Sequence, residues 1–268
     1  MAKKQKALDE LRGAGSVLVA FSGGVDSAVL LALAVEALGR DRVLAVTGRS
    51  ASLPPQDRSD AGEIAESLRV SHQEVDPGEM DRPEYRANAG DRCYHCRAAL
   101  FDALDRIAAD RGLGAVAFGA IADDQGDFRP GMRAAAEHRV LAPLLEAGLT
   151  KEDVRALAAG AGLRIKDKPA SACLSSRIPV GIEVTTERLG QIARAETALQ
   201  DLGFGQVRVR YHGEVARLEL DPLGDRRIAD PEVRRRVVDV VKAAGFRFVA
   251  LDLEGYRTGS LNPKGRLR

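Results

Sequence analysis

The sequence predicts an α/β protein: a doubly wound parallel sheet, followed by a small C-terminal α+β domain. Short apolar runs of strand length alternate with segments of helical period through the first 165 residues, which is typical of a parallel sheet covered by helices. After a stretch with two prolines, a hairpin pattern flanked by helices follows. At 268 residues the chain is long enough for one large domain or two small ones. We expect domains at 1–165 and 182–268, joined by a functional loop at 166–181.

The individual elements follow from hydrophobic periodicity and from helix-start signals. Thr150-Lys-Glu-Asp153 has the pattern of a capping box that opens a helix. In the first domain we expect strands at 16–21, 42–46, 70–75 and 115–118, and helices at 1–12, 28–38, 56–68, 98–111 and 151–160. In the second domain we expect helices at 185–202 and 231–244, a hairpin of strands 206–211 and 214–220, and a strand at 246–253.

The composition narrows the class of protein. The formal net charge is +1, so no global attraction to nucleic acid or to a membrane surface is expected, and Arg234-Arg235-Arg236 is interpreted as the solvated face of a helix. Asp26 and Glu36 interrupt the most apolar region, and no apolar segment of signal-peptide length is present. Three cysteines are too few for a disulfide framework. We expect a cytoplasmic protein without a membrane contact.

The turn between the first strand and the next helix predicts an anion site. In Ser22-Gly-Gly-Val-Asp-Ser27, Gly23 and Gly24 allow close approach of the backbone, and Ser27 is expected to cap the helix, leaving its first N–H groups free. Free N–H groups and the positive end of the helix dipole suit a phosphate or pyrophosphate. The turn matches neither the Walker nor the dinucleotide fingerprint.

The cysteines predict a metal or redox centre. Cys93 and Cys96 have the spacing that lets two thiolates share one metal, and Cys173 is the third sulfur donor. A closed zinc site would need a fourth ligand, for which His95 is available, whereas a [4Fe-4S] cluster held by three cysteines leaves one iron open. Alternatively, Cys173 is spatially unrelated to the other two.

Several charged residues are candidates for ligand contacts. Asp123, Asp124 and Asp127 follow Gly119 at the end of a strand, where they either bind metal and water or form a solvated acidic turn. Arg177 suits a carboxylate or phosphate, and Ser176 beside it can donate a further hydrogen bond. Arg208 and Arg210 lie two apart on an expected strand and therefore point to one face.

Longer motifs resemble a known family. Ser22-Gly-Gly-Val-Asp-Ser27 resembles the pyrophosphate loop (PP-loop) of the ATP pyrophosphatases, whose nucleotide domain has the adenine nucleotide α-hydrolase-like fold. The whole chain resembles the LarE family, ATP-dependent sulfurtransferases of nickel-pincer nucleotide biosynthesis. That resemblance is carried in order by Cys93-Tyr-His-Cys-Arg-Ala-Ala-Leu-Phe101, Ala122-Asp-Asp-Gln-Gly-Asp-Phe-Arg-Pro-Gly131, Glu146-Ala-Gly-Leu-Thr-Lys151, Lys168-Pro-Ala-Ser-Ala-Cys-Leu-Ser-Ser-Arg-Ile-Pro-Val-Gly181 and Leu251-Asp-Leu-Glu-Gly-Tyr-Arg-Thr-Gly-Ser-Leu-Asn262.

The resemblance implies a substrate and residue roles. The substrate would be pyridinium-3,5-biscarboxylic acid mononucleotide, whose carboxylate is adenylated and converted to a thiocarboxylate, with Asp26 helping to place Mg²⁺ and Cys173 and Arg177 next to the chemistry. ATP would be bound by Ser22, Gly23, Gly24, Asp26, Ser27, Gly119 and Asp127. The substrate would be bound by Ser176, Arg177, Glu196, Arg208 and Arg210.

The resemblance also bears on the source of sulfur. Family members with a lone cysteine at the position of Cys173 sacrifice it, whereas members with three cysteines hold a [4Fe-4S] cluster whose open iron carries an added sulfide. The cluster is favoured because this chain has all three cysteines, Cys93, Cys96 and Cys173.

A homo-oligomer and other proteins of the nickel-pincer pathway are the expected partners. Two alternatives stay open: a tRNA thiolase, disfavoured by 4% aromatic residues and no tryptophan, and a non-catalytic zinc-stabilised nucleotide-binding module.

Overall fold

The computed structural model describes residues 2–124, 130–163 and 172–257. The chain divides into two compact units: an N-terminal unit, Met1–Tyr85 with Asp91–Ser171, and a C-terminal unit, Arg86–Gly90 with Ala172–Arg268. Asp127 and residues 166–171 of the expected functional loop lie outside the described residues. Each unit is described by itself below.

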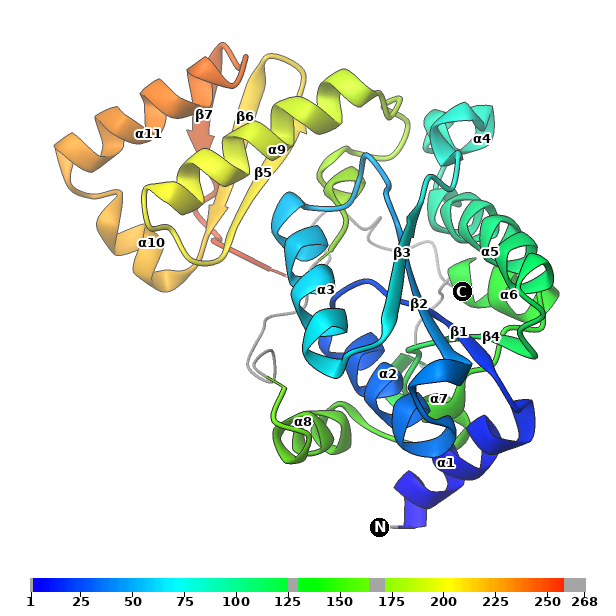
Figure 1. Cartoon of the computed structure of the whole chain (residues 1–268). Helices are drawn as coiled ribbons and strands as arrows, with labels where there is room; N and C mark the ends of the chain where they lie inside the picture. Colours follow the sequence, from blue (N-terminus) through cyan, green and yellow to red (C-terminus); the bar gives the residue numbers. More distant parts are fainter. Residues whose placement is uncertain (1, 125–129, 164–171, 258–268) are drawn as a thin grey trace. The chain divides into compact units, whose positions relative to one another are not determined.

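The N-terminal unit is built on a parallel four-stranded sheet of order β3-β2-β1-β4 (Figure 1). Its strands are β1 (Val17–Ala20), β2 (Val43–Gly48), β3 (Ser71–Val75) and β4 (Ala115–Phe118). Its helices are α1 (Ala2–Ala14), α2 (Val25–Leu38), α3 (Pro55–Leu68), α5 (Arg92–Asp110), α6 (Pro130–Glu137), α7 (Pro143–Glu146) and α8 (Lys151–Gly160). The short helix α4 (Pro83–Ala87) spans the point at which the chain passes from one unit to the other.

Both faces of this sheet are covered, as a doubly wound fold requires. Alternate strand residues enter two separate cores: Val17 and Val19 of β1 pack with helices α1, α2, α3, α7 and α8, whereas Leu18 packs with α5 and α6. Strands β1, β2 and β4 are largely buried and read as continuous apolar runs, which explains why the sequence predicted these three so directly. The order 3-2-1-4 places the topological switch point between β1 and β4, and open α/β sheets bind ligands outside the carboxyl ends of their strands at that point.

The C-terminal unit is a three-stranded mixed sheet packed on helices. Strands β5 (Val207–His212) and β6 (Val215–Leu220) form the predicted antiparallel hairpin, and β7 (Phe248–Leu251) pairs with β6 in parallel. Helix α9 (Thr186–Asp201) packs on β5 and against α11 (Pro231–Ala243), and α10 (Pro222–Arg227) follows β6. On α11, Arg234, Arg235 and Arg236 are all exposed, as predicted for a solvated face.

A distant segment of the chain fixes the backbone after Cys173. Asn88 is buried with a φ of 52°, a conformation that asparagine tolerates better than most residues. Its side-chain amide donates to the carbonyls of Pro179 (2.8 Å) and Ile182 (3.0 Å), and its own carbonyl accepts from the Gly181 N–H at 2.9 Å. The five residues Arg86–Gly90 therefore belong to the C-terminal unit although they lie far away in the sequence.

The capping box of α8 is present as predicted, and it makes stability depend on pH. The Thr150 hydroxyl accepts from the Asp153 N–H, while the Asp153 carboxylate accepts from the Thr150 N–H at 3.0 Å. The ammonium of Lys3, at 2.6 Å, and these Thr150 contacts lower the pKa of Asp153 to about 2.

We predict from this pKa that Asp153 contributes to acid stability. Since its pKa in the folded chain lies below the usual value of 3.8, its contribution is complete above that pH and is lost as the pH falls toward about 2. Urea unfolding of wild type and Asp153→Asn between about pH 5 and 2 checks this. The variant should be less stable at the upper end and should lose less stability on acidification; parallel curves would contradict the prediction.

Candidate active site

The turn after β1 has the geometry of a phosphate loop, with one correction to the sequence analysis. Helix α2 begins at Val25, not at residue 28, and its N-cap is Gly24, which provides no side-chain cap. Ser27 therefore lies inside the first turn and is not the cap. Its hydroxyl donates to the Gly24 carbonyl at 3.0 Å and lies 3.3 Å from both the N–H and the hydroxyl of Ser22, so it orders the loop instead.

Two glycines allow elements to approach this loop closely. Gly23 has a φ of +70°, and a Cβ there would lie 2.7 Å from the Asp57 carbonyl oxygen and 2.9 Å from the Ala61 nitrogen of α3. A Cβ on Gly119 would lie 2.8 Å from the Ser27 nitrogen, so the end of β4 lies directly against the first turn of α2. The predicted nucleotide-binding residues Ser22, Gly23, Gly24, Asp26, Ser27 and Gly119 thus lie together at the switch point of the sheet.

Gly23→Ala should affect both stability and nucleotide binding. The strained φ and the clash with the backbone of α3 are expected to cost about 1–3 kcal/mol and to displace the loop. Gly15→Ala is the matched control, because Gly15 has a φ of +72° with no heavy atom within 4 Å of the added Cβ. Urea unfolding and ATP titration of both variants check this. Equal losses in the two variants would show that the contact with α3 has no effect.

The carboxylate of Asp26 forms an ion pair with Lys151, a residue that the sequence analysis did not place at the site. The ammonium of Lys151, the first residue of α8, lies 2.7 and 2.9 Å from the two carboxylate oxygens of Asp26. The backbone N–H of Lys151 donates to Asp123 at 2.9 Å. The sequence held one signal for the location of Lys151: it directly follows the capping Thr150 and therefore lies at the start of a helix.

The acidic residues after Gly119 bond to the backbone. Asp123 accepts from Lys151, and Asp124 accepts from the Ile121 N–H at 3.1 Å within the same turn. The two carboxylates therefore stabilise the connection between β4 and α8. The third member of the predicted cluster, Asp127, lies outside the described residues.

Cys93 and Cys96 lie in the first turn of α5, which begins at Arg92 and not at residue 98 as the sequence predicted. Neither forms a disulfide, and Cys93 is exposed. The residues between them make contacts of their own: Tyr94 donates to Glu137 of α6 at 2.6 Å, and His95 lies 3.1 Å from Asp91. The motif is therefore a helical turn that presents two thiols.

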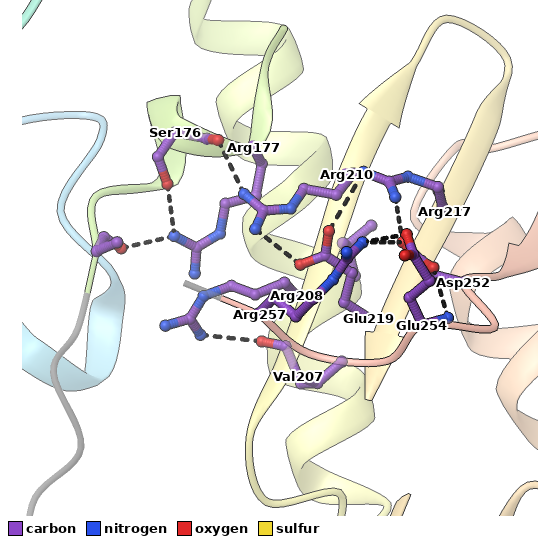
Figure 2. Close-up of polar contacts among 12 residues, drawn as sticks. Ser176, Arg177, Val207, Arg208, Arg210, Arg217, Glu219, Asp252, Glu254 and Arg257 are labelled. Atoms are coloured by element: carbon purple, nitrogen blue, oxygen red, sulfur yellow. Dashed lines mark hydrogen bonds and ion pairs between the residues drawn. The ribbon is translucent and has the colours of Figure 1, made fainter. Parts of the chain in front are cut away.

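Arg177 holds the turn that contains Cys173. Its guanidinium makes a two-point contact with Glu196, 2.9 Å from each carboxylate oxygen, and both side chains are buried. Its remaining nitrogen donates to the carbonyls of Ala172 (2.7 Å) and Cys173 (3.0 Å). The same nitrogen donates to the Ser176 hydroxyl at 3.0 Å (Figure 2). Glu196 also accepts from the Val209 N–H at 2.9 Å. This network joins the Cys173 turn, α9 and β5, which indicates a positioning role for Arg177.

Arg208 and Arg210 lie on β5, and both are largely buried. Arg210 donates to Glu219 at 2.7 Å and to the Ser176 carbonyl at 2.9 Å (Figure 2). Glu219 and Asp252 also bind Arg217.

Arg208 has weaker partners within the described residues. Its guanidinium donates to the Val207 carbonyl at 3.0 Å and lies over the Tyr256 ring, with no carboxylate within ion-pair distance in that part of the chain. Burial, followed by the charge of Arg177, lowers its pKa. A buried guanidinium without a carboxylate is suited to an anionic ligand.

The three cysteines are divided between the two units of the chain. Cys93 and Cys96 belong to the N-terminal unit and Cys173 to the C-terminal unit. Over residues 2–124, 130–163 and 172–257, no group of three or more His, Cys, Asp or Glu side chains has the arrangement of a metal site. The predicted joint site of the three thiols stays a prediction.

Among the residues that the structure describes, no helix has the length and apolar character needed to cross a bilayer.

A glycine turn at the switch point of a parallel sheet, with a helix beginning behind it, is suited to a nucleotide phosphate. The relatives of the chain identify it as a PP-loop domain of the NAD synthase-like class. The family model for NAD synthase matches residues 5–92. The chain is 37% identical over 262 residues to pyridinium-3,5-bisthiocarboxylic acid mononucleotide synthase of Lactiplantibacillus plantarum, covering 97% of this chain and 94% of that protein. It is 41% identical to an uncharacterised protein of Synechocystis sp., over 91% of each chain. The chain belongs to the LarE family.

Proposed function

We propose that this protein is an ATP-dependent sulfurtransferase. It adenylates a carboxylate of pyridinium-3,5-biscarboxylic acid mononucleotide and converts it to a thiocarboxylate. The observation that carries the proposal is the 37% identity over 97% of the chain to a synthase of the bisthiocarboxylic acid mononucleotide. The phosphate loop at the switch point supports ATP as the second substrate.

The first step needs positioning and charge neutralisation. A carboxylate oxygen attacks the α-phosphorus of ATP, and the bond to the bridging oxygen breaks, so pyrophosphate leaves with the electron pair. Main-chain N–H groups of the Ser22–Gly24 turn and the start of α2 suit the phosphates. The Asp26 carboxylate has the oxygen donors that Mg²⁺ prefers, and the ion, when bound, neutralises phosphate charge.

In the second step sulfur replaces AMP. A sulfide attacks the activated carbonyl carbon, the bond from that carbon to the phosphate-bound oxygen breaks, and AMP leaves with that oxygen and the electron pair. Arg208, which lacks a carboxylate partner among the described residues, is proposed to bind the phosphate of the mononucleotide, with Ser176 and Arg210 adjacent. Arg177 and Glu196 are proposed to hold the Cys173 turn against the substrate.

We further propose that Cys93, Cys96 and Cys173 hold a [4Fe-4S] cluster. The donor set fits: none of the three cysteines forms a disulfide, and the first two lie three residues apart in one helical turn. Such a cluster, when bound, would supply an open iron for an added sulfide. Anaerobic iron and acid-labile sulfide determination on wild type, Cys93→Ala and Cys173→Ala tests this. A cluster lost in both variants supports it; zinc without iron, or Cys173 losing its own sulfur on turnover, contradicts it.

We also propose that the protein forms a homo-oligomer in the cytoplasm and that its partners are other proteins of the nickel-pincer pathway. Cysteines without a disulfide fit a reducing compartment. In the C-terminal unit, Phe248 of the edge strand β7 is 50% exposed and Leu253 just beyond it is 94% exposed, which supports self-association through this edge. The molar mass measured by light scattering tests the oligomer.

The activity itself is tested with the three substrates. We expect pyrophosphate release that requires both ATP and the biscarboxylic acid mononucleotide, and a thiocarboxylate product when a sulfide source is added under anaerobic conditions. Pyrophosphate release with tRNA but not with the mononucleotide would replace the proposal with the thiolase alternative. Absence of release with either would exclude adenylation.

A further inference from the structure

We propose that Ser175 is a positioning residue for the sulfur chemistry: its buried hydroxyl donates a hydrogen bond to the sulfur of Cys173 and stabilises negative charge there. The inference deepens the proposed function and rests on it, because it assumes that Cys173 acts as a metal ligand. The sequence analysis assigned a role to Ser176 and none to the serine before it.

The two side chains meet within one short turn. The hydroxyl oxygen of Ser175 lies 3.1 Å from the sulfur of Cys173. Cys173 is the N-cap of the 3₁₀ helix η4 (Leu174–Arg177), and Ser175 is the second residue of that helix. Both residues belong to the C-terminal unit, so the contact does not depend on where Cys93 and Cys96 lie.

Hydrogen bonds to the main chain fix this turn. The Cys173 carbonyl accepts from the Ser176 N–H at 2.9 Å and from the Arg177 guanidinium at 3.0 Å. The Ser175 carbonyl accepts from the Ile178 N–H at 3.1 Å. Because the carbonyls of both contacting residues are hydrogen-bonded, the backbone holds the hydroxyl and the sulfur close to each other.

The two partners differ in their exposure. Ser175 is 1% exposed, whereas Cys173 is half-buried. Water therefore competes poorly for the hydroxyl, while a metal ion or a reactant can still approach the sulfur. A hydrogen bond is electrostatically stronger in such a low-dielectric environment than in water.

The chemistry of the sulfur decides which partner donates. A cysteine binds a metal as the thiolate, which has no proton to donate, so the single O–H of the serine is the donor. A hydrogen bond to an ionised acceptor is stronger than one between neutral groups. Hydrogen bonds to the cysteine sulfurs also help to set the reduction potential of an iron–sulfur cluster. Since reduction adds negative charge, the Ser175 hydroxyl is expected to favour the reduced state.

Redox titration of the reconstituted protein, followed by electron paramagnetic resonance, tests the inference on wild type, Ser175→Ala and the control Thr185→Ala. Ser175→Ala should shift the reduction equilibrium about tenfold toward the oxidised state, a midpoint potential lower by about 59 mV for one electron. Thr185 lies in the same unit, but its hydroxyl caps α9 by accepting from the Arg188 N–H at 3.2 Å. Thr185→Ala should therefore keep the wild-type potential. An equal potential in Ser175→Ala and wild type, or an equal shift in both variants, would overturn the inference.

A second measurement needs no cluster and so separates the inference from the proposed function. With Cys93 and Cys96 both replaced by alanine, Cys173 is the one cysteine left in the chain. Its alkylation by iodoacetamide at fixed pH requires the anionic sulfur, and adding Ser175→Ala should slow the reaction about threefold. An unchanged or faster rate, in variants shown to be folded by circular dichroism, would contradict the role of the hydroxyl. If wild type binds no cluster but alkylation slows as expected, the cluster proposal fails and the contact of Ser175 with the sulfur is supported.

Discussion

Arg177→Met is expected to destabilise the C-terminal unit by about 3–5 kcal/mol, the scale for removing one partner of a buried ion pair. Arg177 and Glu196 are 1% and 8% exposed at their side chains, so the substitution leaves a buried carboxylate with only the Val209 N–H among its described partners. It also removes three hydrogen bonds that hold the turn of Cys173. Urea unfolding measured by circular dichroism gives the free-energy change.

A matched control lies in the same unit. Arg247 and Glu214 form an arginine–glutamate pair with both side chains about two-thirds exposed, at 67% and 66%. Arg247→Met should change stability by no more than about 1 kcal/mol, because exposed ion pairs are screened by water. The double variant Arg177→Met with Glu196→Leu should be more stable than Arg177→Met alone, since no uncompensated charge stays buried. Equal effects of Arg177→Met and Arg247→Met would show that burial of the pair does not matter.

Asp26→Asn is expected to lower pyrophosphate release by on the order of 10²- to 10³-fold, the scale for losing one preorganised electrostatic contact in a transition state. The substitution removes the charge that positions Lys151 and that is proposed to bind Mg²⁺. Initial rates at saturating ATP, with magnesium varied, measure the effect.

Glu36→Gln provides the control for Asp26→Asn. Glu36 lies on the same helix, α2, and pairs with the Lys4 ammonium at 2.8 Å, but it is at the other end of the helix, away from the loop. Its rate should match that of wild type. A rate for Asp26→Asn within about twofold of wild type would remove Asp26 from the proposed nucleotide site.

The sequence was informative where local chemistry decides the structure. The buried strands of the parallel sheet are apolar on both faces, and the Thr150–Asp153 capping box needs only residues three apart; both predictions are confirmed. The short helices α4, α6, α7 and α10 were missed because each has only four to eight residues, too few to show a helical period. Periodicity also placed the start of α5 too late, since Cys93, Tyr94 and His95 give no apolar repeat.

The long-range contacts of the site could not be predicted from local patterns. Arg177 and Glu196 were expected at the substrate end of the site, but nothing in their spacing shows that they bind each other. Asn88 lies about 90 residues from the loop to which it donates hydrogen bonds. Lys151 lies 125 residues from Asp26, and only the parallel sheet brings the starts of α2 and α8 together.

The central claim, attack of a substrate carboxylate on ATP, is tested most directly by isotope transfer. The biscarboxylic acid mononucleotide is labelled with ¹⁸O in its carboxylates and incubated anaerobically with ATP, sulfide and the protein, and the AMP formed is analysed by mass spectrometry. Adenylation predicts AMP that contains one ¹⁸O atom, because the attacking carboxylate oxygen stays on phosphorus when sulfur displaces AMP. Unlabelled AMP accompanying the thiocarboxylate product would contradict the account.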